Sequence, residues 1–327
     1  LIDVPGDVTI TFSGTTSLRR FTSRENVVII GGTLNVSENA QFLNGLTISG
    51  NTTLTGTDIT LEGNSEWTLG KLTVNAVNGL TNKGTLTVTS VQASLEGELN
   101  NEGTIDYAST GTTFLTNGVI NNLEGAIFKV QSRNFVNSDG TSAINNSGTF
   151  QKVGNNNTFV NVAFNNLGNS TIDVQEGVLV LNGGGTSDGA TYTFRNDSRI
   201  ETGGNFNYTG DHIASGDGTL RLTSGNFSVA EGETLRFNSE NGGRILNESG
   251  VSFDVEGTLE FSNASIGGTF NGAGAINLVE NNEWANGRLT INAVDGQVNK
   301  GTQTDNGNPQ EQSGTLNNEG TIIQDIT

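Results

Sequence analysis

A short phrase that recurs along the middle of the chain constrains its fold more than any other feature. In each copy an apolar residue is followed by Asn, one or two variable residues, Gly, a small residue and another apolar residue. Between Leu80 and Ile172, five copies contain Asn82, Asn101, Asn122, Asn146 and Asn166, and with them Gly84, Gly103, Gly125, Gly148 and Gly168. The phrase thus recurs with a slightly variable period of about 20 residues, which is typical of solenoids, whose single repeat cannot bury a hydrophobic face alone.

Within each period, short runs alternate apolar with polar residues, as in Thr85–Val88, Thr171–Val174 and Thr219–Leu222. Alternation with a period of two predicts strands with one buried face. Gly-Gly, Asn-Gly and Asp-Gly pairs between the runs predict turns. No window predicts a helix, because Gly or Asn interrupts apolar spacings of three and four before a second turn is complete.

We therefore expect an all-β fold, a right-handed parallel β-helix (β-solenoid) with coils of about 19–24 residues. Short strands and tight turns would also fit an antiparallel sandwich, but a sandwich gives no reason for Asn to recur. In a parallel stack equivalent residues lie above one another, so the five asparagines would form a ladder of amide hydrogen bonds. We expect this ladder, with its glycines, to hold the coils in register.

A longer repeat is superimposed on the short one. Residues 57–105 match residues 274–322 at an offset of 217, and LNNEGTI occurs both at Leu99–Ile105 and at Leu316–Ile322. We expect residues 1–327 to form a single continuous β-solenoid that belongs to a tandem array. Trp67 and Trp284 occupy equivalent positions of the long repeat, which favours a packing role over a platform for sugar rings.

Charge and composition exclude several classes of partner. The net charge of −19 argues against nucleic acid and anionic membranes, because both require clustered Lys and Arg. The longest apolar runs have the length of a strand, whereas a membrane span needs about 20 consecutive apolar residues. The chain has no Cys, so the fold cannot depend on disulfides or thiolate metal sites. We expect neither a nucleic acid partner nor a membrane span.

Residues with catalytic chemistry are few. His212 is the only histidine, and beside Asp211 near a Gly-Asp-Gly turn we expect it at the surface. Glu102 and Glu124, in neighbouring periods, come closest to a carboxylate pair for glycoside hydrolysis. A solvated turn of mixed charge is the favoured interpretation of that pair. We therefore expect no enzyme, no catalytic residue and no cofactor-binding or metal-binding residue.

Calcium is the one cofactor that the sequence leaves open, because acidic secreted repeats often bind it through Asp-rich turns. Gly216-Asp217-Gly218 stands alone, and neither a Gly-Gly-x-Gly-x-Asp nonapeptide nor an EF-hand loop occurs. A catalytic β-helix would also need a local break in the repeat where acids gather. The most irregular stretch that the sequence offers for such a break runs from Gly189 to Asp211.

Several phrases of the chain together resemble a known family. The phrase FNNLGNSTIDVQEGVLVLNGGGTSDGATYTF at Phe164–Phe194, with LNNEGTI and the Glu-Trp and Gly-x-Leu-Thr blocks, resembles tandem repeats of large secreted bacterial surface proteins. These are cyanobacterial-type, filamentous-haemagglutinin-like β-helical proteins. The resemblance covers nearly the whole chain and implies an extracellular β-helical stalk; it supplies no catalytic residues.

The sequence therefore predicts a structural segment of an extracellular fibre, surface filament or adhesin stalk, outside the cell or at its surface. We expect self-association into fibres or arrays, with a surface polysaccharide as a further candidate partner. The alternative is a carbohydrate-binding or carbohydrate-degrading β-helix of the lyase or tailspike kind.

Overall fold

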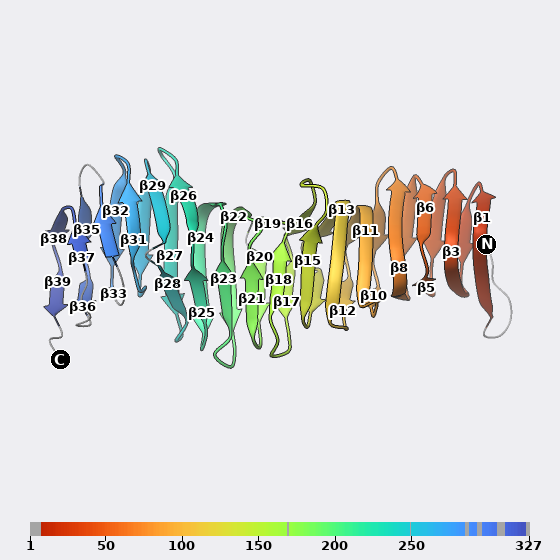
Figure 1. The fold of residues 1–327 in the computed structure, drawn as a ribbon, viewed down its shortest axis with the longest axis horizontal. Helices are drawn as coiled ribbons and strands as arrows, with labels where there is room; N and C mark the ends of the chain where they lie inside the picture. The colour runs from red at the N-terminus through yellow and green to blue at the C-terminus, as the bar shows by residue number, and fades with distance from the viewer. Residues whose placement is uncertain are drawn as a thin grey trace. The chain divides into compact units, whose positions relative to one another are not determined.

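A computed structural model describes residues 8–168, 170–248, 250–284, 288–292, 296–305 and 311–324. These residues contain no helix; their strands pair in parallel and stack, coil upon coil, as a β-solenoid (Figure 1). The all-β parallel solenoid that the recurring phrase predicts is thereby confirmed. A helix able to span a membrane is accordingly absent from the described residues.

The chain divides into two compact units, unit 1 (Leu1–Phe164) and unit 2 (Asn165–Thr327). The strands of unit 1 are β1 (Thr9–Leu18), β2 (Phe21–Ser23), β3 (Asn26–Val36), β4 (Asn39–Phe42), β5 (Leu46–Ser49), β6 (Thr52–Gly56), β7 (Asp58–Leu61), β8 (Asn64–Ala76), β9 (Leu80–Asn82), β10 (Thr85–Val88), β11 (Gln92–Asn101), β12 (Thr104–Tyr107), β13 (Gly111–Asn122), β14 (Ile127–Val130), β15 (Arg133–Asn137), β16 (Ala143–Asn146), β17 (Thr149–Lys152) and β18 (Thr158–Asn161). The boundary between the two units falls within β19 (Ala163–Asn166).

The strands of unit 2 are β20 (Ser170–Val174), β21 (Val178–Leu181), β22 (Gly185–Phe194), β23 (Arg199–Thr202), β24 (Phe206–Gly216), β25 (Thr219–Leu222), β26 (Gly225–Val229), β27 (Thr234–Glu240), β28 (Arg244–Asn247), β29 (Val251–Val255), β30 (Thr258–Ser262), β31 (Gly268–Asn271), β32 (Ala275–Val279), β33 (Asn281–Trp284), β34 (Arg288–Ile291), β35 (Gln297–Asn299), β36 (Thr302–Asp305), β37 (Glu311–Ser313), β38 (Leu316–Asn318) and β39 (Thr321–Gln324).

Each strand of unit 1 pairs with its equivalent in the next coil, so the same position of the coil recurs at each level. Thr85 lies opposite Thr104, and Thr104 lies opposite Ile127. The second of these coils is longer in sequence than the first, and the coil from Thr9 to its partner Asn26 is shorter than both. Because the turns absorb these differences, strand register is kept while coil length varies.

Alternate residues of each strand point into the coil and form a column of apolar side chains. In unit 1, Phe128 packs between Tyr107 and Phe150, with ring centroids 5.4 and 5.1 Å apart. All three rings are fully buried. Burial of such a side chain contributes about 2 kcal/mol, so the column stabilises the stack along its whole length.

Unit 2 has the same construction with additional sheets. One parallel sheet is formed by β26, β29, β31, β34 and β37, and another by β33, β36 and β39. Phe227, Phe253 and Phe270 stack in successive coils of the first of these sheets, with both centroid separations at 5.2 Å. Aromatic stacking therefore repeats from coil to coil here too.

The two copies of the long repeat have equivalent strands. β9, β10 and β12 in unit 1 correspond to β35, β36 and β39 in unit 2, and both ends of each strand match at the offset of the long repeat. Equivalent sequence thus takes the same secondary structure in both places. The tandem array to which we assign the repeat stays a prediction.

Residues 189–211, the stretch that the sequence offers for a break, continue the stack and include one irregularity of register, between Asp188 and Ala190. This stretch runs through β22, β23 and β24, and β23 pairs with β21 in full register, from Arg199 opposite Val178 to Thr202 opposite Leu181. Some of its Gly and Asn residues lie in turns, whereas Gly189, Asn207 and Gly210 lie within β22 and β24, so a turn signal alone does not locate a break.

The interruption of the repeat lies instead between β30 and β31, at residues 263–267. Here Ser265 makes only isolated bridges, to Leu246 on one side and to Glu283 on the other. The coil that contains it, from Thr258 to its partner Ala275, is shorter in sequence than the coil before it, from Thr234 to Thr258. Between β28 and β33 this coil forms isolated bridges in place of a strand.

Candidate functional site: an asparagine ladder

Four of the five predicted ladder asparagines form a continuous column in unit 1. Asn82 Nδ2 donates to Asn101 Oδ1, Asn101 Nδ2 donates to Asn122 Oδ1, and Asn122 Nδ2 donates to Asn146 Oδ1, each at 2.8 Å. All four side chains are buried. Asn166 belongs to unit 2 and is buried there.

The amides of Asn82, Asn101 and Asn122 also donate to the backbone of the next coil. Asn82 Nδ2 donates to Thr104 O at 2.9 Å, and Asn101 Nδ2 donates to Ile127 O at 3.0 Å. Each Asn is the last residue of a strand, and its inward amide reaches the first residue of the strand that follows the turn one coil later. A buried amide without partners costs about 1–3 kcal/mol. A slip in register would leave the whole column unpaired, so the column specifies the register.

The column begins at Asn82 because the preceding coil places Leu61 opposite it. Leu has no hydrogen-bond donor. Asn82 Oδ1 is accordingly buried without a hydrogen-bond partner among the described residues.

Two further ladder residues in unit 2 were missed by the sequence prediction. Asn299 Nδ2 donates to Asn318 Oδ1 at 2.8 Å and to Thr321 O at 3.0 Å. The sequence contains a signal that could have predicted them, because Asn299 and Asn318 are the equivalents of Asn82 and Asn101 at the offset of 217. The long repeat therefore preserves the hydrogen bonding as well as the strands.

A second asparagine row lies on the outer face of the same strands. Asn121 Nδ2 donates to Asn100 Oδ1 at 2.8 Å, and Asn145 Nδ2 donates to Asn121 Oδ1 at 2.7 Å. Adjacent residues of a strand point to opposite faces, so an Asn-Asn pair builds one ladder inside the coil and one outside. The outer ladder is half-buried, so water competes for its hydrogen-bonding groups. We expect it to contribute less to stability than the ladder inside the coil.

The predicted glycines serve two different purposes. A Cβ on Gly103 would lie 2.2 Å from Gly84 O, and one on Gly84 would lie 2.2 Å from Gly63 O, so the coil before leaves no space. A Cβ on Gly148 would meet Ala126 O at 2.4 Å. Gly125 and Gly168 have open space around them, but their φ angles are +79° and +59°. Glycine adopts such positive φ angles more readily than other residues.

Gly103→Ala is expected to lower the free energy of unfolding by about 2 kcal/mol, because the new methyl group can be accommodated only by moving backbone. Gly125→Ala should cost about 1 kcal/mol, the penalty for a left-handed residue with free space around it. Urea denaturation of the two variants measures the difference. Equal losses would show that contact between coils does not select Gly103.

Trp67 and Trp284, the equivalent aromatics of the long repeat, both lie in the interior, fully buried and 6% exposed respectively. Trp67 Nε1 donates to Gly70 O at 3.1 Å, across the bend within β8. Neither ring is positioned on an open face where a sugar could stack on it.

Arg133 is a buried basic residue that no sequence pattern indicates. Its side chain is 1% exposed, with Nη2 donating to Ser90 O at 2.7 Å and Nε donating to Thr113 Oγ1 at 2.9 Å. The guanidinium lies 5.0 Å from the centroid of the Tyr107 ring, and burial lowers its pKa. Because these partners belong to the two preceding coils, Arg133 links three levels of the stack.

Arg133→Lys is expected to lower the free energy of unfolding by about 2 kcal/mol, because an ammonium cannot reproduce the planar fork of donors. The exposed Arg19, which pairs with Glu38, supplies a control, and Arg19→Lys should change stability by less than about 0.5 kcal/mol. Thermal denaturation of both variants tests this. An Arg133→Lys protein as stable as the parent would show that the link contributes nothing to stability.

The prediction that His212 lies at the surface is wrong, because the residue is fully buried. Its exposed neighbour Asp211 carries the polarity that suggested a surface position, whereas His212 occupies the inward position of β24. Nε2 lies 3.1 Å from Thr209 O and Nδ1 lies 3.3 Å from the Tyr192 hydroxyl. With Nε2 donating to the carbonyl, Nδ1 accepts from Tyr192, and burial lowers the pKa of His212 to about 4.

The other candidates for chemistry lie on the surface. Glu102 and Glu124 are exposed, and Glu102 Oε2 is 4.0 Å from Lys83 Nζ. Asp217 is exposed on its turn. Within the described ranges, no group of three or more His, Asp or Glu side chains is arranged to hold a metal ion.

Comparisons of this chain with protein families, with curated proteins and with solved structures find no match.

Proposed function

We propose that this chain is a structural segment of an extracellular fibre, surface filament or adhesin stalk, and that it does not act as an enzyme. The observation that carries the proposal is the buried asparagine column of unit 1, which joins each coil from Asn82 to Asn146 to the next. A column of this kind fixes how coils stack and offers no group for catalysis.

Resistance to axial force follows from the same geometry. Parallel ladders and the apolar column connect every coil to its neighbours, so a force along the stack is shared by many hydrogen bonds. The long repeat supports self-association or tandem extension, because equivalent coils offer equivalent surfaces for stacking. The net charge of −19 keeps such material soluble through mutual repulsion.

Where the protein is found relative to the cell tests the proposal independently of whether the chain assembles into fibres. An antibody against the purified chain, applied to intact cells of the organism that produces it, is expected to label surface filaments or the surrounding material. Labelling that appears only after the cells are lysed would contradict an extracellular role.

A further inference from the structure

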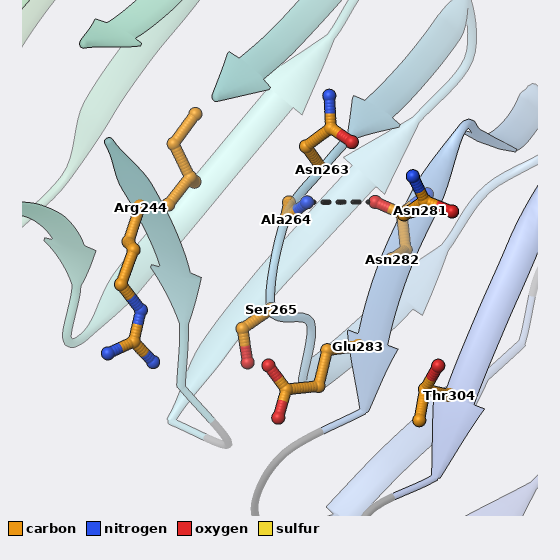
Figure 2. A pocket seen from close by; sticks show the side chains of 9 residues that line it. Arg244, Asn263, Ala264, Ser265, Asn281, Asn282, Glu283 and Thr304 are labelled. Atoms are coloured by element: carbon orange, nitrogen blue, oxygen red, sulfur yellow. Dashed lines mark hydrogen bonds between the residues drawn. The ribbon is translucent and has the colours of Figure 1, made fainter. Parts of the chain in front are cut away.

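The interruption at residues 263–267 leaves a pocket of about 390 Å³ in unit 2. Figure 2 shows its surroundings: the segment with Ala264 and Ser265 runs between the strand with Arg244 and the strand with Glu283. Pockets of about 300–1,000 Å³ are the usual size for small-molecule sites. This volume is sufficient for one or two sugar rings.

Small residues at the break create the pocket. Ala264 and Ser265 lie at the level of the missing strand. The coil on one side of them has Ile245 and Leu246 at this level, and the coil on the other side has β33. Short side chains between longer ones leave a notch. The pocket therefore follows from the short side chains at the break.

A buried amide holds the segment in place. Asn282 Oδ1 accepts from Ala264 N at 3.0 Å, the bond drawn in Figure 2, and Asn282 Nδ2 donates to Val279 O at 2.7 Å. Asn247 Nδ2 donates to Gly267 O at the other end of the segment. The pocket wall is therefore organised before any ligand arrives.

The lining is polar and mixed in character. It combines amide, hydroxyl, carboxylate and guanidinium groups, contributed by Arg244, Asn263, Ser265, Asn281, Glu283 and Thr304. Ile245 and Ala264 add a small apolar surface, and no aromatic ring contributes. Such a set can both donate and accept hydrogen bonds in several directions.

One group in this lining requires a partner. Ser265 is 6% exposed, and its Oγ is buried without a hydrogen-bond partner among the described residues. In Figure 2 its hydroxyl and the Glu283 carboxylate point into the same space. A buried hydroxyl that is left unsatisfied is uncommon in folded proteins, and a ligand hydroxyl in this space would satisfy it.

We propose that this pocket binds a neutral sugar residue of a polysaccharide. A sugar presents several hydroxyls, each a donor and an acceptor, to match the mixed lining. The Glu283 carboxylate would accept charge-assisted hydrogen bonds from ligand hydroxyls, and Arg244 would donate to ligand oxygens. This site is independent of fibre formation and would give a stacked scaffold a means of adhering to a matrix.

Other ligand classes fit less well. The lining holds a single carboxylate, whereas divalent cations take several oxygen ligands with more negative charge. A polyanion would meet Arg244 but also Glu283 and a chain of net charge −19, which repels it. Flat apolar ligands lack an aromatic surface to stack on.

Saturation-transfer NMR of the full chain with cello-, malto- and xylo-oligosaccharides, and with a uronic acid oligosaccharide, tests the proposal. At least one neutral oligosaccharide is expected to bind. Ser265→Ala and Glu283→Gln should each weaken that binding about tenfold, the effect of roughly one lost hydrogen bond to the ligand. Ser265→Ala removes a hydroxyl that has no partner among the described residues, so we expect this variant to fold.

Asp254→Asn is the matched control, because Asp254 is an exposed carboxylate on the neighbouring β29, and its binding should equal that of the parent. Absence of binding by every neutral oligosaccharide would overturn the proposal. Binding that Ser265→Ala and Glu283→Gln leave unchanged would also overturn it, because the sugar would then lie elsewhere. Exclusive binding of the uronic acid oligosaccharide would contradict the neutral class.

Discussion

Asn122→Ala is expected to lower the free energy of unfolding of unit 1 by about 3–5 kcal/mol, because each buried polar group left unpaired costs about 1–3 kcal/mol and a small cavity adds to this. The substitution removes the donor to Asn146 Oδ1 at 2.8 Å and to Thr149 O at 3.1 Å, and the acceptor for Asn101 Nδ2. Urea denaturation measures the total loss.

Hydrogen exchange shows where the loss occurs. Because stability in a solenoid is a sum of coil and neighbour terms, amide protection in β11, β13 and β16 should fall about a hundredfold or more, with smaller changes further away. Asn161→Ala is the control, since Asn161 is exposed and donates to Asn134 Oδ1 at 2.7 Å. It should cost less than about 1 kcal/mol. Equal losses in the two variants would contradict a special role for the buried column.

Unit 2 is expected to lose stability as the pH falls from about 6.5 to about 4. The pKa of His212 is lowered by burial from 6.5 to about 4 in the folded chain, so over this range the unfolded state binds the proton and the folded state does not. Stability that is fully present above pH 6.5 is therefore lost progressively on acidification. The loss from this residue amounts to about 3 kcal/mol at pH 4.

Carboxylates also titrate near pH 4, so the test compares the pH dependence of stability of the parent with that of a His212 variant. His212→Gln keeps an acceptor for Tyr192 and a donor for Thr209 O but cannot titrate. Denaturation from pH 7 to pH 4 should give a shallower decline for His212→Gln than for the parent. Parallel declines would show that His212 contributes nothing to the acid sensitivity.

The sequence predicts the fold and the column well because equivalent residues in a parallel stack lie in contact. Asn82, Asn101 and Asn122 recur at the coil period, and each makes the same two hydrogen bonds. A residue that acts once per chain has no such signal. Arg133 and His212 are buried by their inward register in β15 and β24, which depends on where each strand begins.

The interruption at residues 263–267 could not be located from the sequence for a related reason. Gly and Asn occur both in residues 189–211, where the strands continue to pair, and at the break, residues 263–267. What distinguishes the break is that Ser265 forms isolated bridges in place of a paired strand, and this becomes known only with the register. The pocket beside Ser265 could not be predicted without it.

Electron microscopy of the purified chain over a range of concentrations tests the central claim, a structural filament built by stacked coils. We expect filaments that lengthen with concentration, with strands perpendicular to the axis and an axial spacing of about 4.8 Å. Particles that stay short and monodisperse at every concentration, and that depolymerise an added polysaccharide, would contradict the claim and favour a carbohydrate-degrading β-helix.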